Sequence, residues 1–528
     1  MPKGVSRLDV GYDVLAAVQD LGLGDGDESL SPAIADLEWN QVVFYPAGYA
    51  SKAITFQPSV VLPNGWRFAT ALLPHAGTGG HQPIRFAPVT LNTLVDSPVM
   101  SGRYFKQVDL TPGAKVPVEL DMVADAPADL AITPKQVDGF KQLVVQENRM
   151  FGAHHYASYH MLVTLSDHIS GLGLEHHQSC DIRAPADDLI DADAFLTGAS
   201  EFAHEYTHSW NGKFRRPADL WTPDFNSVPM KGDLLWVYEG LTEYWAEVMA
   251  TRAGFWTPSQ FRQALAMTAA RLDHVPGRTW QSLQDTADMA SRLYYVSPAW
   301  ENWRRGTDFY SEGVLLWLNV DTKLRELSRD QRSLDDFARR FYGMDNGSDV
   351  TRTYTFEDVV AALNAVQPYD WATFLRRMLD SHGEHAPLDG IVRGGYQLTY
   401  TDMPSTMWKA SHDSSQPGDD DAMYSVGFDV TDDGGVGDVL WGGPAFRAGL
   451  IPGMHIAAVD GAVFTPGALD DAIAGSRNAK APITLLVENS GQFETLHVEY
   501  RGGLRYPELV RREGVPDYLD QIVAPVKP

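Results

Sequence analysis

The sequence of 528 residues has a single cysteine, Cys180. A lone cysteine excludes an intramolecular disulfide and a zinc site built from thiolates, so any metal must be held by histidine and carboxylate side chains. No catalytic signature surrounds Cys180, which favours a small buried residue over a nucleophile.

Long apolar runs are also missing. No stretch of about eighteen or more apolar residues occurs, which excludes a helix that spans a membrane. The start of the chain, MPKGVSRLDVGYDV, lacks the apolar segment of a signal peptide and alternates apolar and polar side chains as a strand does. We therefore expect a cytoplasmic protein from the sequence as given, and a periplasmic or secreted one if its true N-terminus is missing.

Basic residues are outnumbered, with 42 Lys and Arg against 69 Asp and Glu, which gives a net charge of −27. Such an acidic surface repels phosphate backbones and anionic membranes, so binding to nucleic acid or to a membrane is disfavoured. It attracts cationic groups, such as the free amino terminus of a peptide. The composition leaves the oligomeric state unknown.

The length and a hydrophobic content of 44% predict about two to four globular domains. Residues 1–125 contain short strand-like runs broken by Pro, Gly and Asn, whereas residues 126–395 show mostly the three-to-four-residue apolar spacing of helices. Strand-like runs return after a polar linker at about 411–422. We expect a multidomain α+β protein with an N-terminal β domain, a mainly helical domain, a further domain at 396–510, and a C-terminal tail at 511–528.

The most informative motif is His204-Glu205-Tyr206-Thr207-His208, which has the form H-E-x-x-H and lies in a segment of helical character. Two histidines four positions apart lie on one helical face and can reach one metal ion. The glutamate between them is not needed as a ligand, so it can hold a water molecule and take its proton. Such a pattern also arises by chance, and two inert histidines on an amphipathic helix are the alternative.

A catalytic zinc ion needs a third protein ligand, and Glu239 in WVYEGLTEYW is the best candidate. The sequence between His208 and Glu239 is loop-like, which lets the chain turn back. Two histidines and one glutamate leave the fourth zinc position open for water. An exposed helix acid is the alternative, but the apolar neighbours of Glu239 favour an inward face. Glu243 follows one turn later and could either hydrogen-bond a ligand histidine or face solvent.

HEYTHSWNGKFRRP resembles the signature of the glycyl aminopeptidase family, which are zinc metallopeptidases with a thermolysin-like catalytic domain and a C-terminal PDZ domain. WVYEGLTEYW is similar to the helix that brings the third ligand in the larger clan, and the similarity extends over residues 35–505. The resemblance implies one zinc ion per chain, with His204, His208 and Glu239 as ligands and Glu205 as general base.

FYSEGVLLW resembles the clan's segment whose tyrosine helps to hold the oxyanion, which implies that role for Tyr310. Without the resemblance, a core aromatic would be the preferred interpretation. Glu312 stands where the clan often has lysine, so the local electrostatics are expected to differ.

GLGLEHHQS resembles the segment whose glutamate binds the free α-ammonium group of the substrate, which implies that role for Glu175. Gly173 lies on the same strand, whose backbone could hydrogen-bond an extended peptide. His176 and His177 could suggest a second metal site, but adjacent side chains point in different directions, which makes that interpretation weak.

GGPAFRAGLIPGMHIAAVDGAVF resembles the core of a PDZ domain, with Met454 where an acid usually follows "PG". YSVGFDV is similar to the carboxylate-binding loop and strand of that domain, with Gly427 letting backbone amides face a terminal carboxylate. The resemblance implies a groove that takes a peptide ligand by strand addition. Asp429 and the acidic linker disfavour anionic ligands, so a purely structural role is equally open.

The resemblance predicts an aminopeptidase that removes small residues, glycine and alanine, from peptides with a free amino terminus, with the thermolysin-like domain at 126–395. Family members usually carry further strands before the point where this sequence starts, so the domain at 1–125 is expected to be incomplete. The alternatives are a zinc endopeptidase whose PDZ domain recruits substrates, and a non-catalytic PDZ scaffold. The intact set of two histidines and two glutamates argues against the scaffold.

Overall fold

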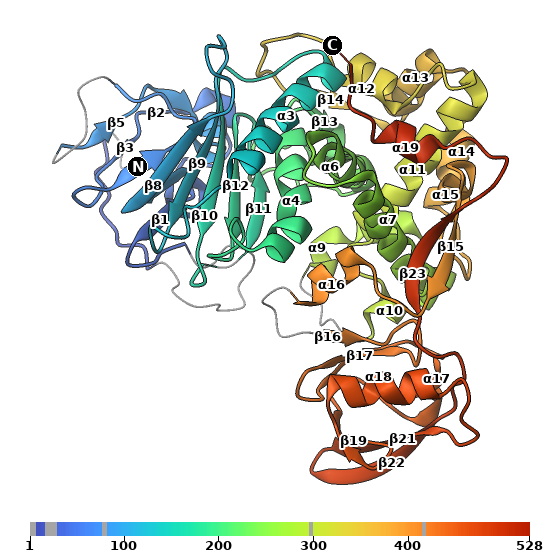
Figure 1. The fold of residues 1–528 in the computed structure, drawn as a ribbon. Helices are drawn as coiled ribbons and strands as arrows, with labels where there is room; N and C mark the ends of the chain where they lie inside the picture. The colour runs from blue at the N-terminus through green and yellow to red at the C-terminus, as the bar shows by residue number, and fades with distance from the viewer. Residues whose placement is uncertain are drawn as a thin grey trace.

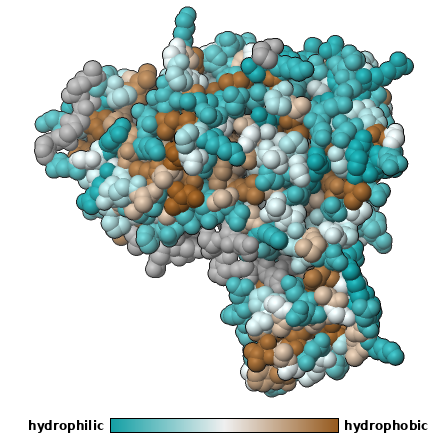
Figure 2. Space-filling model, viewed as in Figure 1, coloured by the Kyte–Doolittle hydropathy of each residue, from teal (hydrophilic) through white to brown (hydrophobic). Residues whose placement is uncertain are grey.

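The computed structural model describes residues 7–15, 29–75, 82–169, 171–294, 299–413 and 419–527. A β-rich part lies at one end, a mainly helical part follows, and a small lobe protrudes from the helical part (Figure 1). The expected multidomain α+β organisation, with a β-rich N-terminal part and a helical catalytic region, is confirmed. In the space-filling view the lobe stands clear of the rest of the molecule (Figure 2).

The N-terminal part consists of short strands, because Pro and Gly residues interrupt its apolar runs. Its strands are β1 (Ile34–Leu37), β2 (Thr55–Phe56), β3 (Ser59–Val60), β4 (Arg67–Ala69), β5 (Ile84–Arg85), β6 (Val89–Thr90) and β7 (Val99–Gly102). β1, β7 and β4 form one antiparallel sheet, and β2–β6 and β3–β5 form two ribbons. Residues 7–15 form no strand, so the strand expected at the start is wrong for that stretch, and residues 1–6 lie outside the described residues.

A five-stranded sheet joins the N-terminal part to the helices. Its strands, in spatial order, are β11 (Leu172–Glu175), β12 (Ser179–Ala184), β10 (Tyr159–Leu165), β9 (Val118–Ala124) and β8 (Tyr104–Asp109). β10 pairs in parallel with β9 and β12, so the strands on either side of residue 125 share one ladder. The boundary expected at residue 125 is therefore corrected: β8 and β9 belong with the strands that follow them. Cys180 is fully buried in β12.

Long helices pack against one face of this sheet and around one another (Figure 1). They are α3 (Pro134–Phe151), α4 (Ala192–Thr207), α6 (Gly240–Ala253), α7 (Pro258–Asp273) and α11 (Ser311–Ser328). α3 begins with a Thr133–Gln136 capping box and ends where Gly152 adopts a left-handed conformation. Within the described residues, no helix has both the length and the apolar character needed to cross a bilayer.

Shorter elements complete the structure, and all of the following except α1 and α2 belong to the helical part. They are α1 (Trp39–Val42), α2 (Leu91–Val95), α5 (Leu235–Tyr238), α8 (Leu283–Asp288), α9 (Ala290–Leu293), α10 (Glu301–Arg304), α12 (Leu334–Tyr342), α13 (Phe356–Val366), α14 (Trp371–Leu379), α15 (Asp389–Arg393), α16 (Thr406–Asp413), β13 (Arg215–Pro217) and β14 (Arg352–Tyr354). α1 and α2 lie instead beside the N-terminal strands. The linker expected at 411–422 overlaps the end of α16, and its residues 414–418 lie outside the described residues.

The lobe has its own core, in which Phe428, Ile456 and Val487 are fully buried. Its elements are β16 (Asp419–Asp421), β17 (Phe428–Thr431), β18 (Val436–Val439), α17 (Pro444–Ala448), β19 (His455–Val459), β20 (Ala462–Val463), α18 (Pro466–Gly475), β21 (Ile483–Asn489) and β22 (Gln492–Val498). One sheet has the order β16-β17-β18 and the other β20-β19-β21-β22.

The chain returns from the lobe to the helical part. β23 (Tyr506–Arg511) pairs with β15 (Tyr396–Thr401), and α19 (Tyr518–Ile522) follows (Figure 1). Leu519 and Ile522 are fully buried in the same core as the long helices. The expected tail at 511–528 is therefore wrong, and the expected domain at 396–510 is too wide, because β15 and β23 at its two ends pack on the helical part.

α6 and α11 approach each other at two glycines. A Cβ atom on Gly240 would lie 2.5 Å from the carbonyl oxygen of Phe309 and 2.8 Å from the Cα of Gly313. Glu239 directly precedes α6, and Tyr310 directly precedes α11. The glycine contact therefore sets how closely these two side chains can lie.

We predict that Gly313→Ala lowers stability by about 1–3 kcal/mol, because a methyl group at this backbone contact forces the two helices apart. Thermal unfolding of the purified protein measures the effect. Gly467→Ala is the matched control, since Gly467 lies in α18 with open space around its missing Cβ. Equal unfolding temperatures for the two variants would contradict the prediction.

Candidate active site

α4 carries the H-E-x-x-H motif into the interior. Asp191 caps the helix by accepting hydrogen bonds from the backbone N–H groups of Asp193 and Ala194. The helix ends at Thr207, and His208 follows directly in an αR conformation, so both histidines still lie on one face. His204, Glu205 and His208 are all buried.

The structure brings Glu239 to this face of α4. The helical segment WVYEGLTEYW is interrupted at Glu239, which lies between α5 and α6. The Oε2 atom of Glu239 is 3.5 Å from Nε2 of His204 and 3.2 Å from Nε2 of His208. These three side chains form a cluster of metal-ligand atoms.

Hydrogen bonds fix how the two imidazoles are protonated. Nδ1 of His208 lies 2.8 Å from the carbonyl oxygen of Asn211, and Nδ1 of His204 lies 2.8 Å from Oε2 of Glu243. Because these partners are acceptors, each Nδ1 carries a proton, so each ring in its neutral form presents its lone pair at Nε2. The contact with His204 is the one that the sequence analysis left open for Glu243.

The two Nε2 atoms lie only 3.0 Å apart. At this distance the two nitrogens either share a proton or bind the same cation, because two bare lone pairs would repel each other. A tetrahedral ion with bonds of 2.0–2.1 Å places its ligand atoms about 3.3 Å apart, which is close to the separations found here. The donor set of two imidazoles and one carboxylate also suits a catalytic zinc ion.

Asn211 connects the end of the H-E-x-x-H motif to the segment that carries Glu239, a role that the sequence did not indicate. Its side-chain amide donates to the carbonyl oxygens of Val237 and Tyr238, at 2.8 and 3.1 Å. These carbonyls directly precede Glu239, so one side chain ties the two ligand-bearing segments together. The residue lies within the quoted HEYTHSWN signature, but nothing in its neighbours indicates a contact with a distant helix.

Glu205 lies beside the cluster, and its Oε2 atom is buried without a hydrogen-bond partner. Burial raises the pKa of Glu205 well above its usual range, and Glu201 adds to the rise although His204 opposes it. A Cβ atom on Gly173 would lie 2.5 Å from the Glu205 carboxylate. The glycine therefore lets the β11 backbone run directly past this acid.

Tyr310 lies over His204, with their ring centroids 6.0 Å apart and nearly parallel. Its hydroxyl oxygen is 2.7 Å from that of Tyr294, a neighbour that the sequence analysis did not identify. Burial and then the nearby Glu239 carboxylate raise the pKa of Tyr310 well above its usual value. The phenol therefore keeps its proton and remains a hydrogen-bond donor.

Glu175 lies at the end of β11, where the hydroxyl of Tyr238 donates a hydrogen bond to its carboxylate. Although burial opposes ionisation, His208 and Lys213 lower the pKa of Glu175 below its usual value. The carboxylate therefore stays negative and can accept a cationic group.

A cavity of about 320 Å³ connects these residues, and its lining includes Gly173, Glu175, Glu239, Tyr294 and Tyr310. Glu38 also lines it, and this acid comes from the N-terminal part of the chain. The N-terminal part thus forms one wall of the candidate active site.

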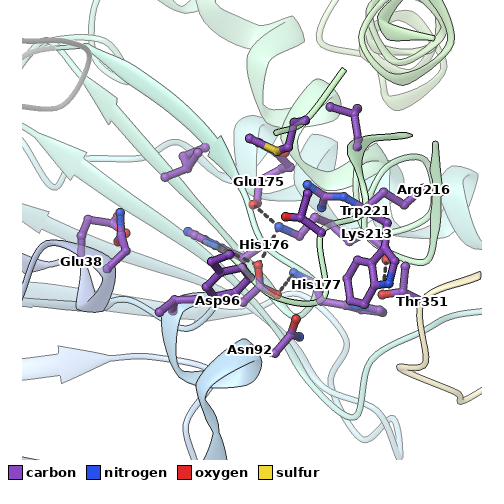
Figure 3. A pocket seen from close by; sticks show the side chains of 17 residues that line it. Glu38, Asn92, Asp96, Glu175, His176, His177, Lys213, Arg216, Trp221 and Thr351 are labelled. Carbon is purple, nitrogen blue, oxygen red and sulfur yellow. Dashed lines mark hydrogen bonds and ion pairs between the residues drawn. The ribbon is translucent and has the colours of Figure 1, made fainter. Parts of the chain in front are cut away.

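An adjoining cavity of about 470 Å³ shares Glu38 and Glu175 with the first (Figure 3). On its wall, Asp96 contacts Nζ of Lys213 at 2.6 Å and lies 3.5 Å from Nδ1 of His176. Within the described residues, no cluster of metal-ligand atoms includes His176 or His177, so a second metal site there has no geometric support.

Glu312 forms ion pairs with two arginines. It is buried and pairs with Arg278 at 2.8 Å and with the guanidinium of Arg305. These two arginines offset the negative charge of Glu312.

Two protein-family models match the sequence. The M61 glycyl aminopeptidase model matches residues 198–316, and the model of the peptidase M61 N-terminal domain matches residues 2–103. The second match ends one residue before β8, which agrees with assigning β8 to the sheet of the helical part. No curated protein matches the sequence.

One solved structure shares the fold. An aminopeptidase N family protein from Idiomarina loihiensis superposes with a TM-score of 0.75 at 19% identity, over 94% of this chain and 83% of that chain. A mutant M1 zinc metallopeptidase from Deinococcus radiodurans, bound to a Tyr-Ser-Ala substrate, matches with a TM-score of 0.44 at 16% identity, over 69% of this chain and 73% of that chain. Models of one family, the M61 glycyl aminopeptidases, therefore match both an N-terminal segment of this chain and the segment that carries His204, His208 and Glu239.

Proposed function

We propose that the protein is an aminopeptidase that holds one zinc ion through His204, His208 and Glu239 and removes small N-terminal residues from peptides. The observation that carries the proposal is the convergence of two imidazole lone pairs and one carboxylate oxygen in a buried cluster. A zinc ion there would polarise the scissile carbonyl group and acidify a water molecule.

The surrounding side chains supply the remaining steps. Glu205 has a free carboxylate oxygen with which to take a proton from the attacking water and pass it to the leaving amine. Tyr310 keeps its proton, so it can donate a hydrogen bond to the oxyanion of the tetrahedral intermediate. The β11 backbone at Gly173 offers an edge along which an extended peptide can lie.

Glu175 supports exopeptidase rather than endopeptidase activity. Its carboxylate is held in the ionised form and lines the same cavity as Glu239, so a free α-ammonium group has an anionic partner beside the metal ligands. The cavity of about 320 Å³ is small, and Tyr294 and Tyr310 occupy part of its wall. This supports a preference for glycine or alanine at the first position.

We further propose that the lobe is a PDZ domain that influences the choice of longer substrates. Gly427 adopts a φ of 88°, a left-handed conformation suited to a carboxylate-binding loop. However, β17 already pairs with β16 on one edge and with β18 on the other. A peptide could add to β17 only by displacing β16, so recruitment of free peptide termini requires that hairpin to open.

Glu205→Gln should reduce kcat by about 10²- to 10⁴-fold, because amide nitrogen and oxygen cannot accept the proton of the attacking water. Zinc content, measured by elemental analysis, should stay at one ion per chain. His208→Ala is the matched variant, since it removes a ligand and should lose both zinc and activity. Loss of zinc from Glu205→Gln would assign Glu205 as a ligand instead.

Glu175→Gln should lower kcat/KM for alanine anilide roughly 30- to 150-fold, which corresponds to about 2–3 kcal/mol of transition-state stabilisation. The reason is the loss of the ion pair with the α-ammonium group of the substrate. The same substrate with an acetylated amine should be poor for both enzymes. Efficient cleavage of the acetylated substrate by the unsubstituted enzyme would favour the endopeptidase alternative.

Replacing residues 414–504 by a Gly-Ser linker should preserve hydrolysis of a small anilide and reduce kcat/KM for longer peptides. This excision keeps β15, β23 and α19, which pack on the helical part. The measurement is the ratio of kcat/KM for the two substrates, with thermal unfolding as the control for folding. An equal loss on both substrates at unchanged stability would mean that the lobe completes the active site.

A further inference from the structure

A buried cluster of three carboxylates lies where the N-terminal part meets the five-stranded sheet. Asp36 is in β1, Glu38 follows that strand, and Asp181 is in β12. Each offers an oxygen atom within 4.8 Å of the other two. Their side chains are 0%, 4% and 0% exposed, respectively, so the cluster is shielded from bulk water.

One arginine faces these three acids. Nε of Arg183 lies 3.2 Å from Oδ2 of Asp36, and Nη2 lies 2.9 Å from Oδ2 of Asp181. Nη2 is also 3.5 Å from Oε1 of Glu38. Within the described residues, the ion pairs of all three carboxylates are made with this one guanidinium, which leaves a charge of about −2 if all the acids are ionised.

Part of the cluster also lacks hydrogen-bond donors. Oδ1 of Asp36, Oδ1 of Asp181 and Oε1 of Glu38 are buried and accept no hydrogen bond in the part of the chain that the structure describes. A buried acceptor left without a partner is costly, and more so when it is charged.

We propose that Asp36, Glu38 and Asp181 bind a calcium ion at the junction of the N-terminal part and the sheet. Three carboxylates, one guanidinium and one divalent cation have no net charge. Carboxylate oxygens are the ligands that calcium prefers, and opposed ligands at its usual bond length lie about 4.6–5.2 Å apart. Glu38 also lines the cavities beside the candidate active site, which gives the ion a route of entry and water ligands.

A second cluster on the same sheet consists of Glu119, Asp121 and His160, and hydrogen bonds from neighbouring side chains satisfy its buried carboxylate. Asp121 accepts hydrogen bonds from Nε2 of Gln107 at 2.8 Å and lies 2.8 Å from Nδ1 of His160. Glu119 accepts a hydrogen bond from the same Gln107 amide at 2.9 Å. The buried carboxylate of Asp121 already has its hydrogen-bond partners, so this cluster does not need a cation. It therefore provides a matched control.

The position of the proposed ion gives it a structural role. It would connect β1 to β12, and Glu38 at one end of the cluster forms part of the wall of the active-site cavity. The ion would therefore hold the N-terminal part against the sheet that carries Gly173 and Glu175. Its contribution is to stability and does not depend on the proposed peptidase chemistry.

The test uses the full-length, zinc-loaded protein in buffer with constant free zinc and no other divalent cation. Calcium chloride should raise the unfolding temperature by about 2–5 °C in a saturable manner, relative to sodium chloride at equal ionic strength. Equilibrium dialysis should find one calcium ion per chain in addition to zinc. Magnesium chloride is the comparison cation and should shift the unfolding temperature less, because magnesium gives up its water ligands reluctantly.

Asp181→Asn should abolish the calcium-dependent shift, whereas Asp121→Asn in the second cluster should retain it. If Asp181→Asn does not fold, Glu38→Gln provides the same comparison, since it changes a ligand at the open end of the cluster. The proposal is overturned if the unsubstituted protein neither binds calcium nor gains stability from it, since protons would then balance the charge. It is equally overturned if both ligand variants keep the full response.

Discussion

Two imidazole lone pairs held 3.0 Å apart are the constraint on which the rest of the candidate active site depends. Left alone, His204 and His208 would turn away from each other or share a proton. Glu243 and Asn211 prevent the rings from turning away by accepting a hydrogen bond from each Nδ1–H, while Glu239 faces both rings. The arrangement is stable only with positive charge at its centre. The fold therefore holds these side chains in the geometry that a metal ion requires before the ion binds.

The sequence was most informative where chemistry depends on local spacing. The i and i+4 relation of His204 and His208 requires only a helix, and the apolar period of the chain indicates that helix. Glu239 could be proposed because residues around it resemble a known helix, but its position in a break between α5 and α6 could not be predicted. Gly240, directly after the break, packs closely on α11, and such a tertiary contact is not visible in the sequence.

Features that rest on distant partners were missed or misplaced. The strands β8 and β9 read like the short strands before them, and nothing in a strand's own residues states which sheet it joins. The segment after residue 511 reads as polar and short, yet Leu519 and Ile522 fill a gap in the main core. The roles of Asn211 and Tyr294 depend in the same way on residues far away in the sequence.

The return of the chain from the lobe has a consequence for the order in which the protein folds during synthesis. Arg252 in α6 donates hydrogen bonds to the carbonyl oxygen of Ile522, at 3.0 Å from Nε and 2.6 Å from Nη2. The helical part therefore remains incomplete until β23 and α19 have left the ribosome. The lobe is made from one continuous stretch and can fold earlier. The catalytic part, although most of it is synthesised first, is the last to be finished.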